Sequence, residues 1–313
     1  MTPVEEAFQK AVDRALCRVS QTRLEGLEAA GDVNAARRIN RAMAELKKLR
    51  GSGQPDYGDR DVALFYTQWY MPQQINIAYS ESTRILRECA LPGTGQLQLV
   101  DLGAGTGAMI LGITLAIATQ PQNIFPKEIV VHQIDHPVML ELGGDIWDAI
   151  LKEARRCPSL DGITRVMQRT RSESISSEET HYSPFPRLND ATRWLTAIHV
   201  AYEQGNKAIN SKFDLLCSYA TPHVRIRTVP SFKTSLLNSY LVLEDGPPPV
   251  DLCLSGSAQC TTSLRRRFRK RFGDQLSPLA ADYLTRSVPW TPIGNDNTPV
   301  AETDCWAEAM QDD

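Results

Sequence analysis

The segment 97–108 constrains the fold more strongly than any other part of the chain. An apolar run of strand length ends at Gly103, and Gly105 and Gly107 follow at alternate positions. The largely apolar segment 109–117 comes next and is suited to a buried helix. Glycines allow the backbone to approach a ligand closely, and the start of a helix offers free N–H groups. A strand, a glycine turn and a helix in this order predict a nucleotide-type binding site.

Two ligand families fit such a turn. Gly103-x-Gly105-x-x-Ala108 satisfies the loose dinucleotide fingerprint, whose last position is glycine or alanine. The run 100–107, Val-Asp-Leu-Gly-Ala-Gly-Thr-Gly, resembles the first motif of class I S-adenosylmethionine-dependent methyltransferases. That resemblance implies that Asp101 organises the methionine end of the cofactor while the glycines pass beneath it. A carboxylate attracts the sulfonium and ammonium of this cofactor and repels a pyrophosphate, so the methyltransferase reading leads. A dinucleotide site and a glycine turn without a ligand remain the alternatives.

The segment 128–135 predicts the second strand. In the methyltransferase family an acidic residue at the end of this strand holds the two ribose hydroxyls, and Asp135 occupies that place. His132 and His136 flank it without partners at metal-ligand spacing, so we expect structural roles for them and no metal. The expected cofactor-binding residues are Asp101, Gly103, Ala104, Gly105, Gly107, Asp135 and Ser218.

The segment 213–219 predicts the fourth strand, whose end faces the transferable methyl group in this family. The Asn/Asp-Pro-Pro-Tyr/Phe motif of amino-directed nucleobase enzymes is absent there, and Ser-Tyr-Ala-Thr stands at 218–221 instead. Tyr219 and His223 are the polar side chains expected near the reaction centre. His223 can remove a proton from a hydroxyl or amine acceptor, since its ordinary pKa is near the working pH. The alternative is a loop histidine that does not contact the substrate.

The N-terminal region is expected to be helical. Apolar residues at helical spacing predict a helical hairpin over 3–50, with a helix stop and start at Gly31-Asp32. The hairpin is expected to be either a stabilising appendage, or a lid or substrate-recruiting module. An aromatic-rich stretch follows a Gly/Ser/Pro linker, and Pro72 is expected to separate helices at 59–70 and 73–90. Tyr79 is expected to line the cofactor and substrate pocket and is the third catalytic candidate.

A narrower resemblance covers about residues 60–115. The pattern formed by 63–66, Met71-Pro72 and Ala78-Tyr79 resembles the approach to the first motif in the mitochondrial small-ribosomal-subunit methyltransferase-like family. The chain departs from that family because Met71 stands where an arginine usually precedes the proline, and because the cysteine cluster is absent. The resemblance implies an RNA-related role.

The fold class expected is α/β, with a Rossmann-like, doubly wound, mostly parallel sheet and an α-helical N-terminal extension. Three regions are predicted: helices at 1–92, a methyltransferase domain at 93–290 and a C-terminal extension at 291–313. Within the domain, the patterns predict a helix at 137–156, a strand at 163–167, a loop at 172–180, a helix at 194–202, a fifth strand at 250–255 and a basic amphipathic helix at 264–272.

Composition limits the partners. The net charge of −3 over 313 residues gives no global electrostatic case for a polyanion. No apolar run approaches membrane-spanning length and no apolar signal core follows Met1, so we expect no membrane partner. The seven cysteines form no Cys-x-x-Cys pair and suit free thiols in the cytoplasm. The sequence gives no indication of the oligomeric state.

The methyl acceptor is the least constrained part of the prediction. A small molecule or peptide fits the aromatic stretch and the negative net charge. RNA fits the basic helix at 264–272 and the ribosomal resemblance. A third possibility is a cofactor-binding assembly factor without transfer activity, since 218–221 carries no acceptor-binding signature.

Overall fold

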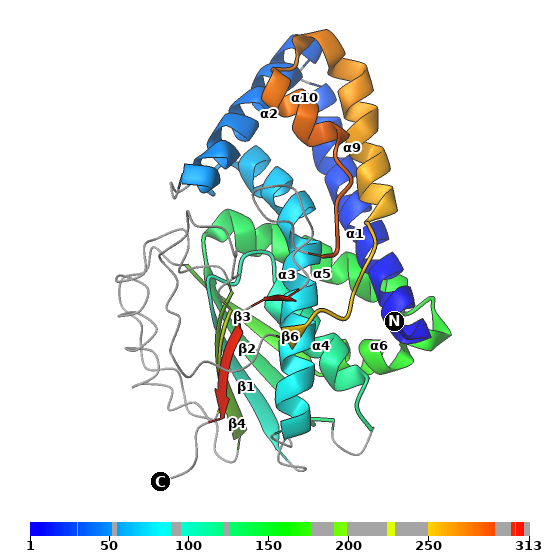
Figure 1. Ribbon diagram of the computed structural model, residues 1–313, viewed down its shortest axis with the longest axis vertical. Helices are drawn as coiled ribbons and strands as arrows, with labels where there is room; N and C mark the ends of the chain where they lie inside the picture. Colours follow the sequence, from blue (N-terminus) through cyan, green and yellow to red (C-terminus); the bar gives the residue numbers. More distant parts are fainter. Residues whose placement is uncertain are drawn as a thin grey trace.

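The computed structural model describes residues 1–29, 31–51, 55–88, 95–121, 125–176, 191–198, 224–228, 250–291, 302–303 and 305–309. A six-stranded sheet lies beneath a group of helices, and one long helix runs from that group down along the sheet (Figure 1). No described helix is both long and apolar enough to cross a membrane.

The sheet has the strand order β3-β2-β1-β4-β5-β8. Its strands are β1 (Gln96–Leu102), β2 (Ile129–Asp135), β3 (Thr170–Ser176), β4 (Ala191–Ile198), β5 (Val224–Thr228) and β8 (Cys305–Ala309). The first five in chain order are parallel, and β8 pairs antiparallel with β5. The chain moves outward from β1 to β3 and then returns to the other side of β1 with β4. This reversal is the topological switch point of a doubly wound sheet, at which ligands bind. The expected α/β fold is therefore confirmed.

The central strand β1 is buried on both faces. Leu97 and Leu99 pack into the main core with α4 (Ala108–Ala118), α5 (Pro137–Ala154) and α6 (Asp161–Gln168). Val100 and Leu102 point to the opposite face, where they contact residues of β2 and β4. This double burial explains why apolar residues occupy both faces of the strand. Asp101 is a buried polar residue of β1, as is Gln98, and it lies on the face of α4.

We call the helices α1 (Pro3–Glu28), α2 (Asp32–Lys47), α9 (Gln259–Phe272) and α10 (Pro278–Thr285) the helical cap. Thr2 and Glu5 form a capping box at the start of α1. Asp13 of α1 accepts the backbone N–H groups of Cys260 (2.7 Å) and Thr261 (2.9 Å) and so caps α9, whose own N-cap residue offers no side-chain bond. The hairpin expected at 3–50 is confirmed, and its helices pack with helices from the other end of the sequence (Figure 1).

The long helix α3 (Arg60–Glu88) joins the cap to the sheet. It packs closely on α4, since a Cβ built on Gly112 would lie 2.4 Å from the Cβ of Ala78. Asn76 ties it to the chain after β6: its amide donates to Leu254 O (2.7 Å) and Trp290 O (3.1 Å). The remaining elements are β6 (Val250–Asp251), β7 (Glu302–Thr303), and 3-10 turns at Lys48–Gly51, Pro158–Leu160 and Gly273–Gln275.

Several sequence expectations are wrong. Pro72 does not divide α3, because buried side chains on both sides of it hold the helix together despite the lost hydrogen bond. The segment 163–167 is helical, and its buried residues Ile163, Val166 and Met167 have helical spacing. The segment 194–198 is part of β4, with apolar residues on both faces.

Three further differences concern edges and ends. The loop expected at 172–180 is a strand to Ser176, because backbone pairing with β2 needs no apolar side chains. The fifth strand expected at 250–255 is limited to β6, which pairs with β7 in a separate small sheet. The C-terminal extension supplies β8 to the main sheet. The fourth strand expected at 213–219 lies outside the described residues.

The helical cap combines helices from two of the regions predicted from the sequence. The helices α9 and α10 lie within the predicted methyltransferase domain by sequence, yet they pack on α1 and α2. Asn40 of α2 accepts the backbone N–H of Ser277 (2.8 Å) at the start of α10. Arg271, near the end of α9, forms ion pairs with Glu28 of α1 (2.9 Å) and Asp32 of α2 (3.1 Å) and so joins these three helices.

Candidate functional site

The candidate site lies where β1 ends and α4 begins, at the switch point of the sheet. Gly103, Gly105 and Gly107 have φ values of 69°, 57° and 85°. These left-handed conformations are open to glycine and strained for other residues. Gly107 is the N-cap residue of α4 and makes no side-chain cap bond, so the N-cap residue itself leaves the first N–H groups of the helix open toward the turn.

Asp135, at the end of β2, is tied to this glycine turn. Its Oδ2 accepts the backbone N–H of Gly105 (2.6 Å), and its Oδ1 accepts that of His136 (2.6 Å). Burial raises the pKa of this carboxyl group, while the two backbone donors act in the opposite direction. Asp135 was expected beside the cofactor, and the structure brings it to the glycine turn. A carboxylate has capacity for more than two donors, so ribose contacts remain compatible with this position.

Asp101 is buried near the carboxyl end of β1, with 1% of its surface exposed. Its Oδ1 accepts a hydrogen bond from Thr196 Oγ1 of β4 (2.7 Å), whereas its Oδ2 has no partner among the described residues. Burial raises its pKa to about 7, and the nearby charge of Asp135 adds to the shift. Sequence reasoning missed Thr196, because the segment that carries it was expected to be a helix.

The helix α5 packs under the glycine turn. A Cβ on Gly143 would lie 3.1 Å from the backbone Cα, C and O atoms of Thr106, so any larger residue would push the backbone of the turn aside. Met139 is the nearest side chain to a Cβ on Gly105, at 3.8 Å. Gly143 was not among the predicted site residues. A glycine inside a helix is a signal of close approach, and it could have drawn attention to this position.

Tyr79 does not reach the glycine turn. Its hydroxyl donates to Glu5 Oε1 of α1 (2.5 Å), and its backbone lies against Gly112. Burial, with the neighbouring Glu5, raises its pKa, and Thr119 is a further hydrogen-bonding neighbour. Thr119 is at the end of α4 remote from Gly107. The position of Tyr79 therefore favours a packing role over the expected catalytic role.

The remaining predicted residues fall into two groups. Ser218, Tyr219 and His223 lie outside the described residues. His132 is buried within the sheet, where its Nδ1 lies 3.1 Å from Glu173 Oε2 and its Nε2 lies 3.1 Å from Gln98 Nε2. His132 alternates along β2 with Asp135 and so belongs to the opposite face of the sheet, away from the glycine turn.

Comparisons with known proteins give no family. No protein-family model and no curated protein matches the chain. A solved structure of SCL7 from Oryza sativa is 15% identical, with 97% of this chain and 82% of that chain covered and a TM-score of 0.40. The methyltransferase domain of bacterial-CtHen1-CN is 13% identical, with 65% and 86% covered and a TM-score of 0.34.

The rRNA methyltransferase aviRa from Streptomyces viridochromogenes is 16% identical, with 50% of this chain and 76% of that chain covered and a TM-score of 0.30. Because these three TM-scores are below 0.5, the Rossmann-like assignment stands on the strand order and the glycine turn. The narrower resemblance to the mitochondrial ribosomal family stays a prediction.

Proposed function

We propose that the protein binds S-adenosylmethionine and transfers its methyl group to an O or N nucleophile of a small molecule or peptide. One observation carries the proposal. Asp101 and Asp135 lie at the ends of β1 and β2 next to a glycine turn, and no described lysine or arginine forms an ion pair with either. The charge of His136 acts on Asp135 alone, so two carboxyl groups whose pKa values burial raises share one histidine as counter-charge and favour a ligand that brings positive charge.

The residues present fit this cofactor better than a dinucleotide. Among the described residues, one buried oxygen of Asp101 has no hydrogen-bond partner, and Gly103, Gly105 and Gly107 place no side chain between the turn backbone and a ligand. A pyrophosphate would meet both carboxylates at short range. The position beside β5, which a sixth parallel strand holds in the dinucleotide fold, belongs to the antiparallel β8.

Each part of the site would have a defined task. S-adenosylmethionine supplies a methyl group that its sulfonium already activates. Asp101 would hold the positive end of the cofactor, Asp135 would accept ribose hydroxyls, and Ser218 would add a contact. Tyr219 and His223 are proposed to orient the acceptor, and His223 to take its proton. The protein otherwise contributes alignment and the exclusion of water.

The basic helix α9 supports a small acceptor over RNA, because several of its cations serve the cap. Arg265 is fully buried between the rings of Trp69 (5.0 Å) and Tyr283 (4.2 Å) and donates to the carbonyl of Tyr283. Arg271 pairs with two carboxylates, and Arg266 donates to Thr285 O (3.3 Å) and Ser287 Oγ (3.1 Å). Fewer cations are therefore available to phosphates than the sequence of 264–272 indicates.

Calorimetry tests the cofactor assignment. We expect stoichiometric binding of S-adenosylmethionine and of S-adenosylhomocysteine, and no binding of NAD. Incubation of lysate fractions with methyl-labelled cofactor then identifies the acceptor, since the label enters small metabolites, protein or RNA. Binding of NAD without binding of either adenosyl compound would refute the assignment, and cofactor binding without any labelled product would leave an assembly factor.

A further inference from the structure

The loop between α2 and α3 reaches the cofactor side of the sheet. A Cβ built on Gly58 would lie 3.2 Å from both Cε1 and Nε2 of His136, and 3.1 Å from Asp56 Oδ1. His136 directly follows Asp135, which holds the glycine turn. The loop that follows the cap helix α2 therefore touches the strand end that carries a predicted cofactor contact.

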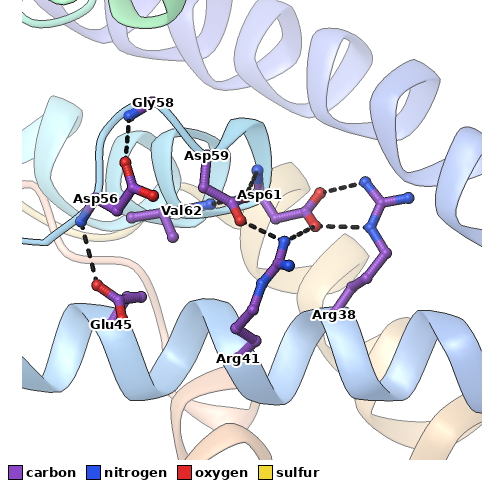
Figure 2. A network of polar contacts seen from close by, with 8 residues as sticks. All are labelled: Arg38, Arg41, Glu45, Asp56, Gly58, Asp59, Asp61 and Val62. Carbon is purple, nitrogen blue, oxygen red and sulfur yellow. Dashed lines mark hydrogen bonds and ion pairs between the residues drawn. The ribbon is translucent and has the colours of Figure 1, made fainter.

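The loop is held firmly from the side of the cap (Figure 2). Glu45 of α2 accepts the backbone N–H of Asp56 (3.2 Å), and Asp56 Oδ1 accepts that of Gly58 (3.0 Å). Asp59 forms an ion pair with Arg41 and accepts the backbone N–H of Asp61 (2.8 Å), near the start of α3. A loop with this many bonds has a fixed shape, so the position of Gly58 against the imidazole is defined by the cap.

From His136 the contacts continue to the glycine turn. The His136 Nδ1 accepts the backbone N–H of Val138 (3.3 Å) and so caps α5, and the backbone N–H of His136 donates to Asp135 Oδ1 (2.6 Å). Asp135 Oδ2 accepts the N–H of Gly105 (2.6 Å). A displacement of the imidazole is therefore passed to the carboxylate and to the turn.

We propose that Gly58 and His136 are positioning residues for the cofactor, which act through Asp135 and the glycine turn. The loop 56–59 is then a fixed wall of the adenosyl site that the helical cap supplies. This inference rests on the proposed binding of S-adenosylmethionine. The new element is that the cap sets the geometry of the cofactor site. A helical region that only stabilised the fold would have no such role.

A double-mutant cycle on the full-length protein tests the inference. Gly58→Ala places a methyl group against the imidazole, and His136→Asn removes the ring while retaining a side-chain acceptor for the N–H of Val138. We expect Gly58→Ala alone to weaken S-adenosylhomocysteine binding about fivefold to tenfold, because small misplacements in a binding site are costly. In the His136→Asn background the same change should weaken S-adenosylhomocysteine binding by less than about twofold.

The matched control is Gly144→Ala, since a Cβ at Gly144 meets nothing within 4 Å, and it should bind as the wild type does. Equal losses from Gly58→Ala in both backgrounds would overturn the inference, because the effect on binding would then not pass through the imidazole of His136. A change in melting temperature without a change in affinity would overturn it too. Failure of the wild-type protein to bind S-adenosylhomocysteine would instead refute the proposed function, and the inference with it.

Discussion

Two buried carboxylates in this protein have opposite surroundings. Asp61, at the start of α3, receives two hydrogen bonds from Arg38, at 2.8 and 2.9 Å (Figure 2). Asp101, at the end of β1, receives one hydrogen bond from a neutral hydroxyl and has no counter-charge among the described residues. The guanidinium compensates the desolvation of Asp61, whereas nothing described compensates that of Asp101. The first arrangement is typical of a structural contact and the second of a binding site.

The largest effect is expected from removing the charge of Asp101. Asp101→Asn retains an oxygen for the bond from Thr196 but cannot attract a cation, so we expect S-adenosylmethionine affinity to fall by about a hundredfold or more. At pH 8 the same variant should be more stable than the wild type by roughly 2–4 kcal/mol, because a buried charge is removed. Calorimetry and chemical denaturation measure the two effects.

The pH dependence follows from the pKa of Asp101, raised from 3.8 to about 7. The unfolded chain loses this proton near pH 4, while the folded protein keeps it until about pH 7. Asp101 therefore lowers stability progressively as the pH rises from about 4 to 7 and gives no further change above that range. The stability difference between Asp101→Asn and wild type should grow over this interval, and a difference independent of pH would contradict the burial argument.

The opposite outcome is expected at Asp61. Asp61→Asn removes the charge that Arg38 compensates, and we expect the free energy of unfolding to fall by about 2 kcal/mol, because Arg38 is partly exposed and can rehydrate. Cofactor affinity should change far less than in Asp101→Asn. A variant as stable as the wild type would show that this ion pair contributes nothing net, and the comparison between the two carboxylates would fail.

The smallest effect sharpens the boundary of the site. Gly143→Ala forces a methyl group against the backbone of Thr106, so affinity for S-adenosylhomocysteine should fall about tenfold. Its neighbour Gly144 faces open space, and Gly144→Ala should leave affinity unchanged while adding about 0.5–1 kcal/mol of stability. Isothermal calorimetry on the Gly143→Ala and Gly144→Ala variants decides whether the glycine turn binds the ligand. Equal affinities of the two variants would exclude binding at the turn.

The parts that sequence could predict were those with a strong local pattern. The strand, turn and helix around Gly105 need left-handed glycines and apolar faces, and both requirements are visible in the order of residues. The helices α1 and α2 follow their apolar spacing. The edge strand β3 escaped prediction because its polar side chains carry no alternation, and only the backbone of β2 defines it.

The site residues that were missed depend on contacts distant in sequence. Thr196 reaches Asp101 across 95 residues, and Gly58 meets His136 from a loop that the cap helix α2 holds in place. Tyr79 was assigned to the pocket from its aromatic surroundings, yet its bond to Glu5 over 74 residues directs it elsewhere. Such partners are chosen by packing in three dimensions, which local residue patterns do not encode.

The bond between Asp13 and the start of α9 has a consequence for synthesis of the chain. Its partners are 248 residues apart, so the ribosome completes α1 long before Thr261 exists. Until then the buried face of α1, which includes Phe8, Val12 and Leu16, lacks one of its covering helices. The nascent protein therefore exposes part of the apolar face of this amphipathic helix through most of translation, when exposed apolar surface favours aggregation.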